Sequence, residues 1–69
     1  MDVRDKIRIF LEEKGMLKNA FARKVGMSQV QMYAILSKRR KVPRKYWKKI
    51  IKFTEKKIKI EDFLDMGDE

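Results

Sequence analysis

Apolar side chains recur along this chain at spacings of three and four residues, the period of a helix with one buried face. Glycine, proline and clusters of charge interrupt this pattern and divide the chain into segments. We expect helices at residues 2–14, 18–25, 28–37 and 43–54, with a short fifth helix at 60–65. A chain of 69 residues is long enough for one small domain. The pattern therefore predicts an all-α fold, a bundle of four to five helices in a single domain spanning residues 1–69.

The second and third segments have the order of a helix-turn-helix motif. Their inward positions are Phe21, Ala22, Val25, Met27, Met32, Ile35 and Leu36. Gly26 follows the last inward residue of the first of these helices, where a left-handed turn residue is needed. Ser28 comes two residues later and suits the N-cap of the next helix. Two short helices joined in this way form a helix-turn-helix.

The run Phe21-Ala22-x-x-Val25-Gly26-Met27-Ser28, with Met32 and Ile35 inward, resembles the helix-turn-helix of phage Cro and repressor proteins. The resemblance continues to Cro-like and YdaS-antitoxin-like prophage regulators through Val42-Pro43, Trp47, Ile50, Thr54 and Asp62-Phe63. It covers roughly residues 17–64. It implies a lambda-repressor-like bundle and a regulator of transcription that binds duplex DNA sequence-specifically, most simply a phage or prophage repressor. Two copies would cover a palindromic operator with half-sites one helical turn apart.

The charged residues are unevenly distributed. The net charge is +9, and all ten acidic residues lie at positions 2–13 or 55–69. Thirteen Lys or Arg and no Asp or Glu lie between Lys14 and Thr54. Solubility alone would be served by mixing the two signs. A solvated basic face is one interpretation, but the coincidence with the helix-turn-helix favours a polyanionic partner.

The third segment is predicted to read DNA with the face turned away from the core. The N-terminus of such a helix approaches base edges. Gln29 can bond the N6 and N7 edge of adenine, and Val30 can pack on a thymine methyl group. Tyr33 can bond a base or a phosphate, with half-buried packing as the alternative role. The predicted base-contacting residues are Ser28, Gln29, Val30, Tyr33 and Ser37.

Cations flank this face. The resemblance implies a phosphate contact for Lys18, because many family members have at this place a glutamine that touches a phosphate, and lysine can do the same. Residues 38–41 carry four cations and no glycine, so one of them adopts a positive φ or the helix runs longer. We expect this segment to grip phosphates, with a disordered solvated loop as the alternative. The predicted phosphate-contacting residues are Lys18, Gln31, Lys38, Arg39, Arg40, Lys41, Arg44 and Lys45.

The chain from residue 43 onward carries an excess of apolar residues. Pro43 suits the start of the fourth helix, and Trp47 fits a core position better than a stacking platform for bases. Residues 58–60 alternate like a short strand. Because Cro-like proteins pair through C-terminal segments, the resemblance implies a homodimer contact, and the alternative is closure of the monomer's own core. The residues concerned are Ile51, Ile58, Ile60 and Leu64.

Several classes of function find no support in the residues. The chain has no cysteine and no histidine, so the usual nucleophiles, general bases and metal clusters are missing. It has no glycine-rich phosphate loop either. We predict that it is not an enzyme and uses no cofactor, metal or small-molecule substrate. No apolar run is as long as a membrane span and no signal peptide opens the sequence, so a cytoplasmic protein without a membrane partner is expected.

Two functions other than transcription regulation remain open. One is a sequence-tolerant basic module that binds nucleic acid such as RNA. The other is an antitoxin-type regulator that sequesters a protein partner. An exposed apolar patch around Ile51 and Ile58 would favour the antitoxin.

Overall fold

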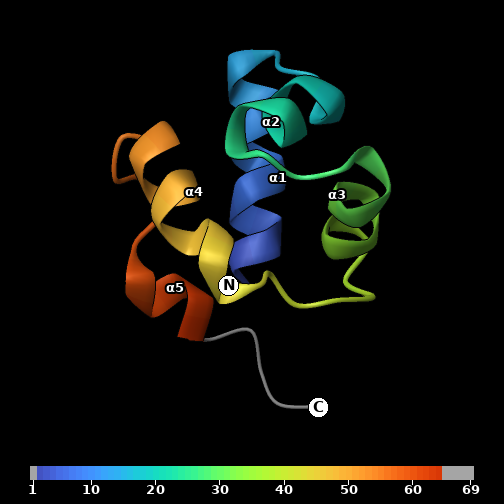
Figure 1. Ribbon diagram of the computed structural model, residues 1–69. Helices are drawn as coiled ribbons and strands as arrows, with labels where there is room; N and C mark the ends of the chain where they lie inside the picture. Colours follow the sequence, from blue (N-terminus) through green and yellow to red (C-terminus); the bar gives the residue numbers. More distant parts are fainter. Residues whose placement is uncertain (1, 65–69) are drawn as a thin grey trace.

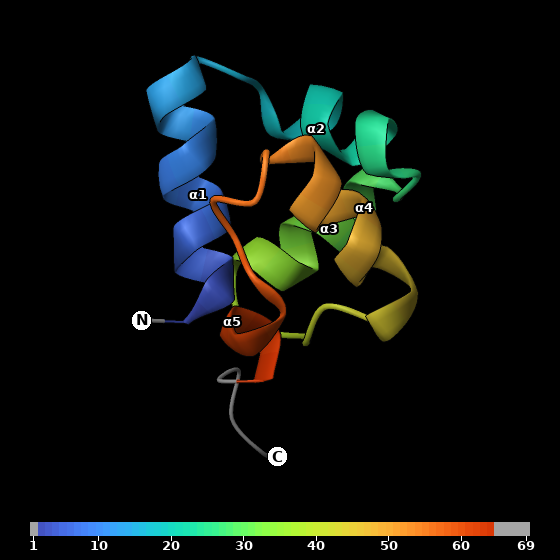
Figure 2. The same cartoon turned by 90° about the vertical axis from the view of Figure 1, so that its left-hand side faces the viewer.

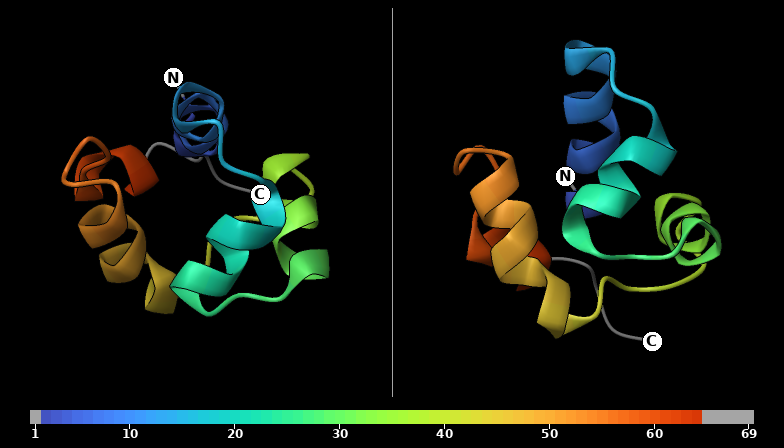
Figure 3. Two further views of the ribbon diagram at one scale, coloured as in Figure 1. Left: turned by 90° about the horizontal axis from the view of Figure 1, so that it is seen from above. Right: turned by 45° about the horizontal axis from the view of Figure 1, so that its top comes forward.

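The computed structural model describes residues 2–64, which form five α-helices and one 3₁₀ turn around a shared core (Figure 1). The elements are α1 (Val3–Lys14), α2 (Lys18–Val25), α3 (Gln29–Leu36), η1 (Arg44–Tyr46), α4 (Trp47–Phe53) and α5 (Ile60–Leu64). In the view of Figure 1, α4 lies to the left of α1 and α3 to its right, and Figure 3 shows the two helices apart from each other when seen from above. The predicted all-α fold is confirmed. Residue 65, the end of the predicted fifth helix, lies outside the described residues.

Helices α2 and α3 form the predicted helix-turn-helix, and local chemistry sets both of its inner ends. Gly26 has φ 76°, and its N–H donates to the Arg23 carbonyl at 3.3 Å. The next N–H, of Met27, donates to the Ala22 carbonyl at 2.8 Å. The Ser28 hydroxyl then accepts from the Gln31 N–H at 3.1 Å and caps α3. These bonds satisfy backbone groups that the helix ends leave unpaired, and so they fix the turn.

The fourth predicted helix, 43–54, differs from the observed structure at its start. Residues Arg44–Tyr46 form a 3₁₀ turn, in which the Tyr46 N–H donates to the Pro43 carbonyl at 3.0 Å, and only Trp47–Phe53 is α-helical. The tighter turn carries the Tyr46 side chain into the core, where it is 8% exposed. The apolar period that begins at Trp47 could not show this, because Tyr46 lies outside that stripe.

The core is built from residues of every helix. Its buried members are Val3, Ile7, Phe10, Leu11, Phe21, Ala22, Val25, Met27, Met32, Ile35, Leu36, Val42, Tyr46, Ile50, Ile58 and Phe63. The Phe53 ring contacts Phe21 at a centroid distance of 5.5 Å and Phe10 edge-on at 6.1 Å. Trp47 stacks on Phe63 at 4.9 Å, so α5 is held against α4. Trp47 thus packs in the protein, as its helical position predicted.

The chain between α4 and α5 returns alongside α1 and completes the core (Figure 2). Ile58 is 2% exposed, so the prediction that it lines a homodimer contact is wrong: its side chain closes the monomer's own core. No strand forms within residues 2–64: residues 57 and 58 form a bend, and Ile60 begins α5. Ile60 and Leu64 remain 49% and 64% exposed, and Ile51 is half-buried.

Asp2 and Asp62 each accept a backbone hydrogen bond and form an ion pair. Asp2 caps α1 by accepting from the Arg4 N–H at 2.8 Å, and it also pairs with the Arg4 guanidinium. Asp62 of α5 accepts from the Lys59 N–H at 2.8 Å and pairs with Lys6 of α1 at 2.6 Å. The Arg4 side-chain bond lowers the pKa of Asp2, and the Lys59 backbone bond, followed by Lys6, lowers the pKa of Asp62.

Acidification is therefore expected to weaken the fold. Because both carboxyls have a lower pKa in the folded chain than in the unfolded chain, the unfolded state takes up protons first. The stabilisation is complete above about pH 5 and is lost as pH falls through about 4 and below. Thermal unfolding should show a lower Tm at pH 3 than at pH 6. The double variant Asp2→Asn, Asp62→Asn should show a smaller difference, and an equal difference would contradict this origin.

Candidate nucleic-acid interface

Helix α3 has one buried face and one open face. Met32, Ile35 and Leu36 are at most 2% exposed and seat the helix on the core. On the opposite face, Val30 is 80% exposed and Tyr33 is 46% exposed. The residues predicted to contact bases, which are Ser28, Gln29, Val30, Tyr33 and Ser37, are all exposed. A fully buried valine side chain gains about 1.5–3 kcal/mol, so an exposed Val30 contributes little to folding and is available to a partner.

A chain of polar contacts crosses from α2 to the start of this face. The Tyr33 hydroxyl donates to Asn19 Oδ1 at 3.2 Å, and Gln29 Nε2 donates to the Tyr33 hydroxyl at 3.4 Å. The Lys18 ammonium lies 5.6 Å from the centre of the Tyr33 ring. With one amide hydrogen used in this way, Gln29 keeps its oxygen and a second N–H to offer outward. That donor–acceptor pair matches the N7 and N6 groups of adenine.

Two adjoining hollows run along the open face and share Val30 and Ala34. Tyr33, Ser37 and Arg39 complete one of them. Ser28, Gln31 and Arg40 complete the other. The structure therefore brings Arg39 and Arg40 beside the same helix face as the predicted base-contacting residues.

The other predicted phosphate-contacting residues divide into two groups. Arg44 and Lys45 are exposed on η1, each 5.2 Å from an aromatic centre, Trp47 for the first and Tyr46 for the second. Gln31 and Lys41 are half-buried. The Gln31 amide oxygen accepts from the Tyr46 hydroxyl at 3.5 Å, so this side chain links α3 to η1.

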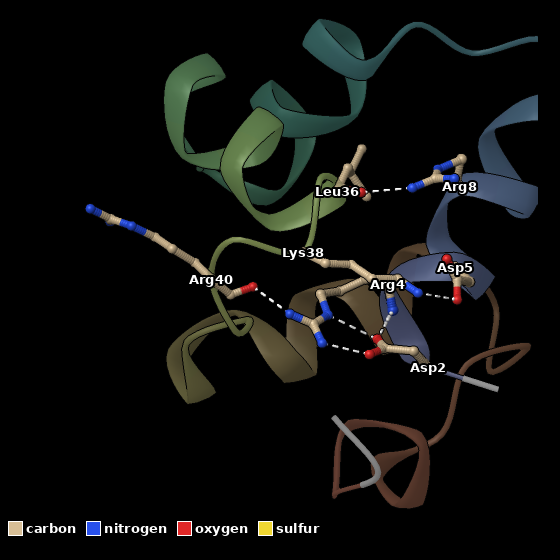
Figure 4. A network of polar contacts seen from close by, with 7 residues as sticks. All are labelled: Asp2, Arg4, Asp5, Arg8, Leu36, Lys38 and Arg40. Carbon is tan, nitrogen blue, oxygen red and sulfur yellow. Dashed lines mark hydrogen bonds and ion pairs between the residues drawn. The ribbon is translucent and has the colours of Figure 1, made fainter. Parts of the chain in front are cut away.

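Lys38, the remaining member of the predicted phosphate-contacting group, has a partner within the protein. It is the residue of 38–41 that adopts a positive φ, 66°, which is one of the two outcomes expected for a segment without glycine. Its ammonium pairs with Asp5 of α1 at 2.7 Å (Figure 4). The Lys38 ammonium is therefore directed toward α1, while its side chain stays 44% exposed. No spacing within residues 38–41 indicated this, because the partner lies 33 residues earlier in the chain.

Asn19 and Arg4 are the residues that the sequence reasoning missed. Asn19 could have been identified from its position in the first turn of α2. The packing of α2 against α3 in a helix-turn-helix brings that turn close to Tyr33. Arg4 gave no such signal: it is a cation on a helix face otherwise made of apolar core residues, and it is 5% exposed. Its partners include Asp2 and the Arg40 carbonyl.

The described residues form neither a metal-binding cluster nor a membrane-spanning helix. Residues 2–64 hold no cluster of three or more carboxylates that could bind a metal ion. Within the same range, no helix is long and apolar enough to cross a membrane. Comparisons of the chain with protein-family models, with curated proteins and with solved structures found no match.

Proposed function

We propose that this chain binds duplex DNA sequence-specifically through the open face of α3 and regulates transcription, as a phage or prophage Cro-like repressor. One observation carries the proposal: an exposed helix face bears Gln29 and Val30, with Arg39 and Arg40 beside it. This face belongs to the segment between Lys14 and Thr54, which has no carboxylate to repel phosphate.

The proposed mechanism is steric. An α-helix with its side chains is about 10–12 Å across, and the major groove of B-DNA is about 12 Å wide, so α3 fits the groove. Gln29 reads adenine and Val30 packs on a thymine methyl, while Lys18, Arg39 and Arg40 neutralise phosphates. A bound copy then obstructs polymerase. Two copies would occupy half-sites about 34 Å apart.

Separate observations bear on the two alternative functions. An exposed apolar patch around Ile51 and Ile58 would favour an antitoxin-type regulator, but Ile58 is 2% exposed and Ile51 is half-buried. A sequence-tolerant RNA-binding module would use the same cations. However, the major groove of A-form RNA is too deep and narrow for side chains to read, so an exposed Gln29–Val30 pair favours DNA.

The test begins with selection of bound sites from random duplexes. On the selected duplex, Gln29→Ala should lose about 1–3 kcal/mol of binding free energy, with little change on a scrambled duplex. Gln31→Ala is the comparison variant: it makes the same chemical change at a predicted phosphate-contacting residue, so any loss of affinity should be equal on the selected and the scrambled duplex. The wild-type affinity should fall with salt with a logarithmic slope near −5 for about six phosphate contacts. Salt-independent binding, or tighter binding to structured RNA at matched salt, contradicts the proposal.

A further inference from the structure

Helix α1 makes three polar contacts with residues 36–40, which are the last residue of α3 and the segment after it (Figure 4). The contacts are Arg8 to the Leu36 carbonyl at 2.7 Å, Asp5 to the Lys38 ammonium at 2.7 Å, and Arg4 to the Arg40 carbonyl at 2.9 Å. The three α1 residues lie within about one helical turn of each other, so they form one patch. We call these three contacts the α1 clasp.

The α1 clasp engages every second residue of the segment 36–40. The intervening residues, Ser37 and Arg39, line a hollow on the open face of α3. This alternation follows from the turn that ends α3, where the N–H of Lys38 donates to Ile35 and the N–H of Arg39 donates to Ala34, both at 2.9 Å. Glycine is the residue that favours the left-handed conformation found at Lys38, so this conformation costs free energy that contacts from α1 can offset.

Arg40 is oriented by its own backbone. Its carbonyl points toward the Arg4 guanidinium, while its side chain extends the opposite way (Figure 4). That side chain lines the second hollow together with Ser28 and Val30. Arg4 is itself fixed, because its side chain is 6% exposed and both oxygens of Asp2 accept bonds from it.

We infer that Arg4, Asp5 and Arg8 are positioning residues of the nucleic-acid interface: they hold residues 36–40 so that Arg39 and Arg40 meet phosphates beside the groove that α3 enters. The inference rests on the proposed function. Its consequence is that a change on α1, away from the open face of α3, alters the number of phosphates contacted.

Asp5→Ala tests the inference against simple electrostatics. Removing a negative charge should by itself tighten binding to DNA. Loss of the Asp5 contact of the α1 clasp should instead weaken binding to the selected duplex by about fivefold at physiological salt, with a salt slope less steep by about 1, the signature of one lost phosphate contact. Glu12→Ala is the matched control, because Glu12 is an exposed acid of the same helix outside the clasp. It should bind as tightly as the wild type or more tightly.

A second measurement needs no DNA. Amide hydrogen exchange at Lys38 and Arg39 should accelerate in Asp5→Ala and not in Glu12→Ala. The exchanged pair Asp5→Lys, Lys38→Asp keeps the net charge and should restore both slow exchange and the steep salt slope. If Asp5→Ala does not fold, Asp5→Asn takes its place in both measurements.

The outcomes separate the inference from the function. Wild-type protein that binds no duplex refutes the proposed function, while the exchange measurement still decides whether the α1 clasp orders residues 36–40. Wild-type protein that binds with a steep salt slope, together with Asp5→Ala that matches Glu12→Ala in affinity and slope, overturns the inference alone. Unchanged amide exchange in Asp5→Ala overturns it as well.

Discussion

Phe21→Ala should lower the free energy of unfolding by about 3–5 kcal/mol, the range for removing a buried phenylalanine from a core. Phe21 is 0% exposed, and its ring contacts Phe53, which in turn packs on Phe10. The Phe53 ring of α4 therefore joins Phe21 of α2 to Phe10 of α1. Because so small a domain is marginally stable, a large fraction of the molecules should be unfolded at 25 °C. Urea denaturation followed by circular dichroism measures the loss.

Leu17→Ala is the control for Phe21→Ala. Leu17 is as apolar but 74% exposed, so its truncation should change the free energy of unfolding by less than about 0.5 kcal/mol. A loss below about 1 kcal/mol for Phe21→Ala would show that the rings of α1, α2 and α4 do not form the centre of the core.

Val30→Glu should weaken binding to the selected duplex by about a hundredfold, equivalent to about 3 kcal/mol, while leaving the fold intact. The exposed position tolerates the larger side chain. In the complex, the carboxylate would face phosphates and would lose its hydration without gaining a partner. Affinity measured by fluorescence anisotropy at fixed salt reports the effect, and thermal unfolding confirms that the variant is folded.

Ile9→Glu separates this local effect from the change in net charge. Ile9 is 41% exposed on α1, so the same negative charge is introduced away from α3. We expect Ile9→Glu to weaken binding only slightly. Equal losses for the two variants would mean that overall charge, and not the open face of α3, determines affinity.

The apolar period predicted the helices well because each core residue of α1 to α3 repeats on one face of its own helix. The apolar period did not predict the structure of residues 55–60. Residues 58–60 alternate apolar and polar in sequence, which is the pattern of a strand, yet Ile58 packs against α1 in a bend and Ile60 is 49% exposed at the start of α5. Glu55 and Lys56 likewise adopt positive φ values of 56° and 67° without glycine. These positive φ values depend on tertiary packing, which the local sequence does not show.

One part of the candidate interface could likewise be predicted from the sequence, and the other part could not. The open face of α3 could be predicted, because the exposure of Gln29, Val30 and Tyr33 follows from burying the opposite face of one helix. The engagement of Lys38 by Asp5 and of the Arg40 carbonyl by Arg4 could not, because each contact joins residues more than 30 positions apart. Local sequence indicates which side chains are charged, and tertiary structure decides which of those charges remain available to a partner.

The most direct measurement of the central proposal is the set of intermolecular nuclear Overhauser effects from the Val30 methyl groups in a complex with the selected duplex. If α3 lies in the major groove, these methyls should show contacts to thymine methyl and cytosine H5 protons, which line that groove. Contacts only to sugar protons, or base contacts made instead by α4 or α5, would contradict the account.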